Sequence, residues 1–285
     1  MASEWVVPAV LRELWQGYRR HRAGQVGLAV AAGMALVAIT APWIAPESPI
    51  AQDLYLGATP PSLAHPLGTD ELGRDVLSRV IHGARISLTV GLAAVGIALG
   101  LGTIIGLSAG YYGGTFDLWL MRLVDLMLAL PSVLLAVVVV AILGPSLANA
   151  MLAVGIVIVP QYARLARASA LTIKEEEYVL AMRALGASDA RILARSILPN
   201  AVPPLIVQTT LGMATAILDA AGLSFIGLGA QPPSPEWGAM MSQGRELLLR
   251  APWVVTSPGV AILITVLGFN LAGDALRDVL DPRLR

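Results

Sequence analysis

The chain has 285 residues, of which 56% are hydrophobic and only 13% charged, and its formal net charge is zero. Because soluble domains carry about 25% charged residues, this composition predicts a protein that lies in lipid. The chain contains no cysteine, which excludes disulfides, thiolate metal sites and cysteine nucleophiles. Its histidines, His21, His65 and His82, are too scattered for a short-spaced zinc motif.

Residues 1–23 are predicted to form a cytoplasmic amphipathic segment. Leu11, Leu14, Trp15 and Tyr18 recur at helical spacing, and polar or basic residues occupy the other side. Such a helix lies on the inner leaflet with its aromatic rings at headgroup depth. The alternative is an unstructured tail.

Six later stretches are long and apolar enough to cross a bilayer, which requires about 20 residues each. They are Gly24–Ala45, Ala84–Gly110, Phe116–Leu143, Ala148–Ala168, Ala201–Gly222 and Val255–Ala275. In the second stretch, glycines at four-residue spacing indicate close helix packing. In the third, Pro131 is expected to kink the helix.

The basic residues predict the orientation. If the N-terminus is cytoplasmic, fourteen of the 19 Lys and Arg residues lie inside, as the positive-inside rule requires. Both termini are then cytoplasmic. The expected organisation is a first transmembrane helix at 24–45, an extracytoplasmic loop at 46–83, a core of five transmembrane helices at 84–275 and a cytoplasmic tail at 276–285.

The longest inside loop, about residues 170–200, predicts a helix–turn–helix. Gly186 follows Leu185 where a helix end favours positive φ, Ser188 can cap a second helix from Asp189, and Pro199 is expected to stop that helix. One face of the second helix carries a stripe formed by Ile192, Leu193, Ser196 and Ile197, and Arg191 and Arg195 point away. This predicts an element held by a partner; the alternative is an amphipathic loop resting on the bilayer.

The same loop carries Ala181, Gly186, Leu198 and Pro199 at the spacing of a known signature: E-A-A, three residues, Gly, nine residues, I-x-L-P. It departs from that signature at the positions of Leu180, Met182 and Ser196. The loop thus resembles the cytoplasmic loop of binding-protein-dependent ABC permeases, in which a coupling helix docks in a groove of the ATPase. The resemblance implies a coupling segment from Tyr178 to Asp189, with these contact residues: Tyr178, Ala181, Arg183, Gly186, Ala187, Ser188 and Asp189.

Three further stretches, residues 65–88, 223–241 and 270–285, resemble the C-type permease of the dipeptide, oligopeptide and nickel branch. The resemblance implies the type I importer permease fold and a multi-pass protein of the cytoplasmic (inner) membrane. It also implies a homologous permease, one or two ABC ATPase subunits and an extracytoplasmic substrate-binding protein as partners, besides the lipid bilayer. Nothing indicates a nucleic-acid partner.

No catalytic chemistry is expected in this chain. The phosphate loop G-x-x-x-x-G-K-S/T needs a lysine after glycine, and the only lysine is Lys174, within TIKEEE. ATP and magnesium are therefore expected on partner ATPases, with no cofactor, metal or catalytic residue here. The predicted function is a permease subunit of a dipeptide or oligopeptide importer. The alternatives are a nickel or other small-solute permease of the same branch, and an ion-coupled secondary transporter.

Charges at membrane depth are costly and are considered individually. Arg122 and Asp125 lie three residues apart on one helical face and are expected either to form a structural pair or to line the translocation path. Asp219, near the outer end of the fifth stretch, has no basic neighbour in sequence. It either has a structural role or faces the translocation path, where it meets a peptide ammonium group. The charged residues of the first outside loop are expected on a solvated face: Asp53, Asp70, Glu71, Arg74, Asp75 and Arg79. The resemblance makes this loop a platform for the binding protein.

Overall fold

A computed structural model describes residues 18, 19 and 21–280. Those residues form helices and loops without a strand, and the all-α prediction is confirmed. Most of the predicted N-terminal amphipathic segment lies outside the described residues, as do residues 281–285.

Five helices are long and apolar enough to cross a membrane. They are α2 (Arg22–Ile44), α3 (Val76–Tyr112), α6 (Leu147–Ile173), α9 (Leu198–Phe225) and α11 (Trp253–Leu280). A bent pair, α4 (Gly114–Leu128) and α5 (Ser132–Leu143), makes the sixth span if it is counted as one. The described residues also form three short α-helices, α7 (Glu177–Ala184), α8 (Asp189–Ile192) and α10 (Trp237–Gly244), and three further helical turns at Leu54–Leu56, Leu193–Ile197 and Arg245–Leu247.

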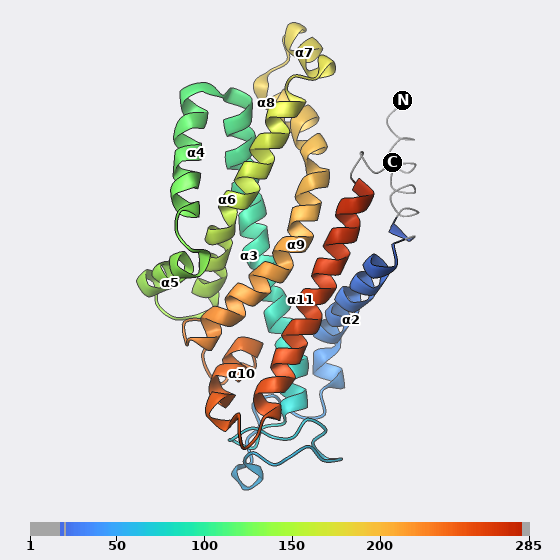
Figure 1. Cartoon of the computed structure of the whole chain (residues 1–285), viewed down its shortest axis with the longest axis vertical. Coiled ribbons are helices and arrows are strands. Elements are labelled where there is room, and N and C mark those ends of the chain that lie inside the picture. The colour runs from blue at the N-terminus through green and yellow to red at the C-terminus, as the bar shows by residue number, and fades with distance from the viewer. Residues whose placement is uncertain (1–17, 20, 281–285) are drawn as a thin grey trace.

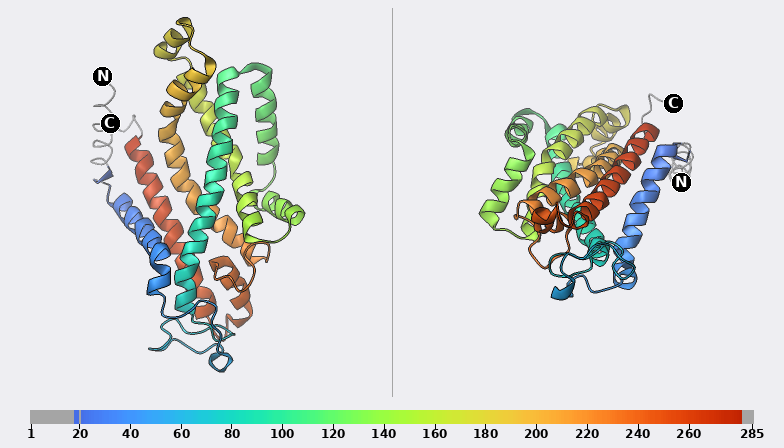
Figure 2. Two further views of the ribbon diagram at one scale, coloured as in Figure 1. Left: turned by 180° about the vertical axis from the view of Figure 1, so that it is seen from behind. Right: turned by 60° about the horizontal axis from the view of Figure 1, so that its bottom comes forward.

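The helices form one elongated bundle with α3 and α6 at its centre, α2 and α11 on one side, and α4 and α5 on the other (Figures 1 and 2). We call its two extremities the α7 end and the α10 end. The start of α2 and the end of α11 lie towards the α7 end, where His21 and Asp278 form an ion pair at 3.2 Å.

The glycines of α3 act as the predicted packing device. A Cβ at Gly106 would lie 2.2 Å from the Ala163 carbonyl oxygen, and one at Gly102 would lie 2.5 Å from the Tyr162 Cβ. Only glycine therefore lets the backbones of α3 and α6 approach this closely.

α3 begins at Val76, earlier than the span predicted from Ala84. The Asp75 carboxylate accepts a hydrogen bond from the Ser78 amide at 2.7 Å and caps the helix there. With 37 residues, α3 is about 55 Å long and exceeds the hydrocarbon core of about 30 Å. Hydropathy detects only the part of such a helix that lies in lipid.

Pro131 breaks the third span more sharply than a kink. α4 and α5 meet there at 95°, and Pro131 is the N-cap residue of α5. Proline lacks the amide needed by the preceding turn and restricts Leu130 to non-helical conformations, so the helix ends before it.

Pro199 does not stop the helix that begins at Asp189, contrary to the prediction. The chain passes from α8 through a π-helical turn at Leu193–Ile197 directly into α9, which also contains Pro203 and Pro204. Pro199 sits in the first turn of α9, where a missing amide removes little of the hydrogen bonding. At the end of the π turn, the Leu198 amide donates a hydrogen bond to the Leu193 carbonyl.

Candidate functional site

The loop between α6 and α9 reverses at Gly186, which has the positive φ, +80°, that its position predicts. The Ala187 amide donates to the Met182 carbonyl and the Gly186 amide to the Arg183 carbonyl, both at 3.0 Å. These two bonds form a Schellman motif, which satisfies the carbonyls at the end of α7.

Ser188 occupies the predicted N-cap position of α8, but its hydroxyl makes no capping hydrogen bond. The neighbouring Asp189 instead accepts a hydrogen bond from the Tyr111 hydroxyl at 2.6 Å. The Arg183 guanidinium lies 5.5 Å above the Tyr111 ring, a cation–π arrangement. The side-chain amide of Asn200, on α9, donates a hydrogen bond to the Tyr178 hydroxyl at 3.1 Å. The loop is therefore held in one orientation by the end of α3 and the start of α9.

The apolar stripe predicted to face a partner is instead buried within this chain. Ile192 and Ile197 are fully buried and Ser196 nearly so, and the Ser196 hydroxyl contacts the Met182 sulfur at 3.1 Å. The stripe closes the base of the loop because the π turn packs against α3 and α6. It belongs to the hydrophobic core.

A different apolar surface remains open at this end. Leu185 is 87% exposed, and Tyr178 and Leu180 are exposed by nearly half. We define the α7 surface as five of the exposed residues of this helix and its C-cap: Tyr178, Leu180, Ala181, Arg183 and Leu185; Glu177 and Ala184 are exposed as well. Of the other predicted contact residues, Gly186, Ser188 and Asp189 are exposed and Ala187 is half-buried. The sequence analysis did not identify Leu185 as a surface residue.

The expected pair of Arg122 and Asp125 does not form. Asp125 pairs with Arg164 of α6 at 2.7 Å, and Asp117 accepts two hydrogen bonds from Arg167, both of 2.6 Å. An ion pair within one helix is weaker when the arginine precedes the acidic residue. The two acidic residues of α4 pair instead with two arginines of α6. Arg122 lines a cavity of about 320 Å³ between these helices.

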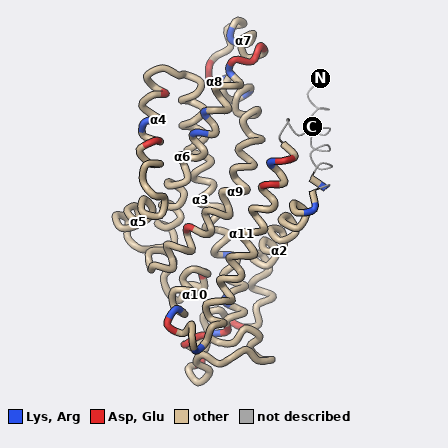
Figure 3. The backbone as a smooth tube through the Cα atoms, in the orientation of Figure 1, with Lys and Arg blue, Asp and Glu red and all other residues tan. Residues whose placement is uncertain are grey.

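Asp219 lies on α9 and is half-buried. Among residues 18, 19 and 21–280 it has neither a hydrogen-bond partner nor an ion pair. Charged residues otherwise gather mainly towards the two extremities of the bundle (Figure 3).

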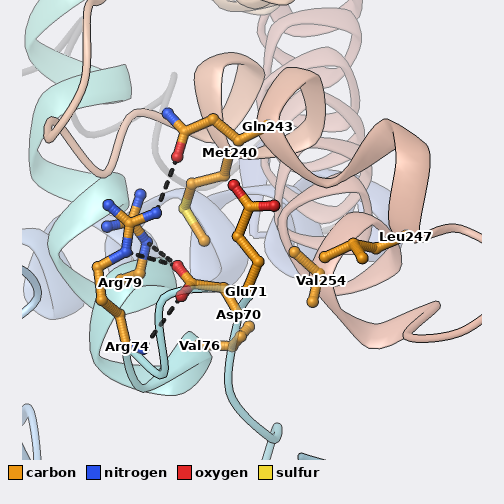
Figure 4. A pocket seen from close by; sticks show the side chains of 9 residues that line it. All are labelled: Asp70, Glu71, Arg74, Val76, Arg79, Met240, Gln243, Leu247 and Val254. Carbon is orange, nitrogen blue, oxygen red and sulfur yellow. Dashed lines mark hydrogen bonds and ion pairs between the residues drawn. The ribbon is translucent and has the colours of Figure 1, made fainter. Parts of the chain in front are cut away.

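At the α10 end, the loop predicted to be solvated contains a buried charge cluster. Asp70, Arg74, Asp75 and Arg79 are each at most 5% exposed. The Asp70 carboxylate accepts from Arg74 Nε at 2.6 Å and lies 3.6 Å from Arg79 Nε. Arg74 also donates a hydrogen bond to Gln243 Oε1, in the last turn of α10, at 3.0 Å (Figure 4). The expectation of a solvated face is wrong for these four residues; Asp53 and Glu71 are exposed.

Two tryptophans and a glutamate join this loop to the helices. Trp253 Nε1 donates to the Thr69 carbonyl and Trp237 Nε1 to the Val80 carbonyl, both at 3.0 Å. The buried Glu236 carboxylate accepts the amides of Gly238 and Ala239 and caps α10. Burial raises the pKa of Glu236 above its ordinary value, and these amide hydrogen bonds oppose the shift. Residues 65–88 and 223–241, two of the stretches that carry the resemblance, are therefore connected by hydrogen bonds at the α10 end. We call this contact region the joint.

The comparison with known families decides what this bundle is. Residues 102–285 match the family described as binding-protein-dependent transport system inner membrane component. The chain belongs to this family. Residues 10–61 match the N-terminal transmembrane domain of oligopeptide transport permease C. The chain is therefore a multi-pass permease subunit of an ABC importer in the inner membrane, and its family leaves ATP hydrolysis to separate subunits.

Similar proteins carry related names. The di/tripeptide transport system permease protein DppC of Pseudomonas aeruginosa is 49% identical over 286 residues, covering 98% of this chain and 94% of the relative. The dipeptide transport system permease protein DppC of Escherichia coli K12 is 51% identical over 281 residues, covering 96% and 94%. A chain of the inward-facing MetNI methionine ABC transporter superposes with a TM-score of 0.58 at 21% identity, covering 71% of this chain and 97% of that one. That likeness supports the fold alone.

Proposed function

We propose that this chain is the C-type permease subunit of an ATP-driven dipeptide importer. It forms half of the translocation path, and a homologous permease forms the other half. Its relatives, about half identical over nearly their full length, are named as dipeptide and di/tripeptide permeases, which favours this cargo over oligopeptides or nickel.

The α7 end is proposed to be cytoplasmic. Arg164, Arg167, Lys174, Arg183, Arg191 and Arg195 all belong to α6 and the loop at that end, which agrees with the positive-inside rule. Both termini are then cytoplasmic, and residues 46–75 lie outside, where a substrate-binding protein delivers cargo. ATP and magnesium reside on one or two ATPase subunits.

The α7 surface carries the proposal for ATPase binding. It presents Leu185, Leu180 and Tyr178 next to Arg183 on a loop that the rest of the chain already holds in place. A preorganised, protruding apolar group with a charged neighbour is what anchors a helix in a partner's groove. Leu185 is the expected anchor because it is the most exposed apolar residue of the loop.

The test is Leu185→Asp in the complete importer. A carboxylate in an apolar groove loses its water without gaining a partner, so the ATPase should no longer co-purify with the permeases and ATP-dependent dipeptide uptake should be lost. The matched control is Leu249→Asp, since Leu249 is 99% exposed at the α10 end. Co-purification of the ATPase with the Leu185→Asp variant at the wild-type level would refute the α7 surface as its binding site.

A further inference from the structure

One face of α9 carries polar residues and a glycine between residues 208 and 222. At 100° per residue, Gln208, Thr215, Asp219 and Gly222 fall within an arc of about 60°. Thr215 and Gly222 are exposed and Asp219 is half-buried. A Cβ at Gly222 would meet no atom within 4 Å, so the space beside this part of the face is open.

The polar row continues onto α6 towards the α7 end. The Gln208 side-chain amide donates to the Gln161 Oε1 at 3.3 Å, and one turn further along α6 Arg164 pairs with Asp125. Gln208 also lines a cavity of about 530 Å³ together with Arg277 of α11. Volumes of roughly 300–1,000 Å³ are typical of sites for small molecules.

This face of α9 is unsuited to lipid. Neither the Asp219 carboxylate nor the Thr215 hydroxyl makes a hydrogen bond within the described part of the chain. A carboxylate exposed to hydrocarbon is costly, and intramembrane charges consequently face a water-filled cavity or a partner group. An unpaired carboxylate beside open space therefore places this face of α9 towards an aqueous path.

We infer that Asp219 binds the α-ammonium group of the dipeptide in transit, and that Thr215, Gln208 and Gln161 form the polar wall along which it moves to the cavity beside Arg277. This inference rests on the proposed function, since it names the residue of that path which contacts the cargo. An ammonium group offers three donors and a full positive charge, which complement a carboxylate that this chain leaves without a partner. Asp219 and Gln208 are eleven residues apart, or roughly 16 Å along the helix, so the row spans much of the membrane.

The first test uses the natural absence of cysteine from this chain. Asp219→Cys and Thr215→Cys are placed singly in the complete importer in proteoliposomes, and labelling by a membrane-impermeant thiosulfonate is measured on the separated chain. Both cysteines should react, because thiolates form only in water. The control is Leu263→Cys on α11, an apolar position that is 63% exposed and should stay unlabelled in lipid. Labelling at 219 no faster than at 263 would overturn the inference.

The second test measures ATP-driven uptake of a radiolabelled dipeptide by the Asp219→Asn and Asp219→Glu variants. Loss of the charge-assisted bond should lower uptake by Asp219→Asn roughly tenfold, and Asp219→Glu should retain most of it. Wild-type uptake by Asp219→Asn overturns the inference, and so does its failure to assemble with the other subunits, which would assign Asp219 to a subunit contact. If the wild-type importer takes up no dipeptide, the proposed function fails instead, whatever the labelling shows.

Discussion

A single carboxylate, Asp70, holds two buried arginines at the α10 end. Arg74 bonds it directly, and Arg79 lies next to it with one guanidinium nitrogen, Nη2, buried and without a hydrogen bond among the described residues. The sequence suggested a solvated loop because charged side chains are mostly exposed. Their burial depends on Gln243 and Trp253, which are distant in sequence.

Asp70→Asn should destabilise the protein strongly. Removing one partner of a buried ion pair leaves the other charge uncompensated, at a cost of about 3–5 kcal/mol. We expect a lower Tm and less folded protein on size-exclusion chromatography in detergent. The control is Glu71→Gln, which removes a charge from the adjacent, exposed residue and should change Tm little. Equal Tm values for the two variants would show that Asp70 does not stabilise the joint.

At the scale of elements, the α7 loop combines a locally encoded turn with a position set by distant contacts. Gly186 has φ +80°, and a Cβ added there would have no atom within 4 Å. A side chain at this position would therefore strain the backbone without clashing with a neighbour. Tyr111 and Asn200 then determine the direction in which the loop points.

Gly186→Val should weaken ATPase attachment while the two permeases still assemble. A β-branched residue in the left-handed region costs about 1 kcal/mol or more, which opens the Schellman turn and moves Leu185. The measurements are ATPase co-purification and dipeptide uptake. Gly186→Asn is the matched control, because asparagine adds a side chain of similar size but tolerates positive φ. If Val and Asn at this position reduce binding equally, the turn conformation is not what the ATPase requires.

On the scale of the whole molecule, two helices of the bundle are only weakly covered by the rest of the chain. α4 has Val124 as its single buried residue, and its side towards the rest of the chain is held by ion pairs to Arg164 and Arg167. α5 is apolar after its first residue, Ser132, and buries only Ala136 and Val140. Such weakly covered helices fit a subunit whose remaining surface meets lipid and another subunit.

The isolated chain in proteoliposomes should therefore transport no dipeptide, whereas the complete assembly should do so with ATP. Transport requires a path enclosed on all sides, and the polar face of α9 is open in this chain alone. Uptake is measured with and without the homologous permease, the ATPases and the binding protein. Transport at the full rate by the isolated chain would contradict a half-path.

The sequence by itself determined the features that depend on neighbouring residues and on the solvent. Hydropathy marked six spans, Gly186 marked the turn, Pro131 marked the place of a bend but not its sharpness, and the position of Lys174 ruled out a phosphate loop. Each of these follows from local backbone stereochemistry or from the cost of polar groups in lipid. None requires knowing which distant segments meet.

Only the tertiary structure decided which groups are partners and which face is covered. It paired Asp125 with Arg164, buried Ile192 and Ile197, and enclosed the charges around Asp70. It also left Asp219 without a partner in the described chain. Helical periodicity identifies a face but not what lies against it. Burial and ion pairing depend on contacts between residues far apart in sequence, and folding alone brings these within a few ångströms.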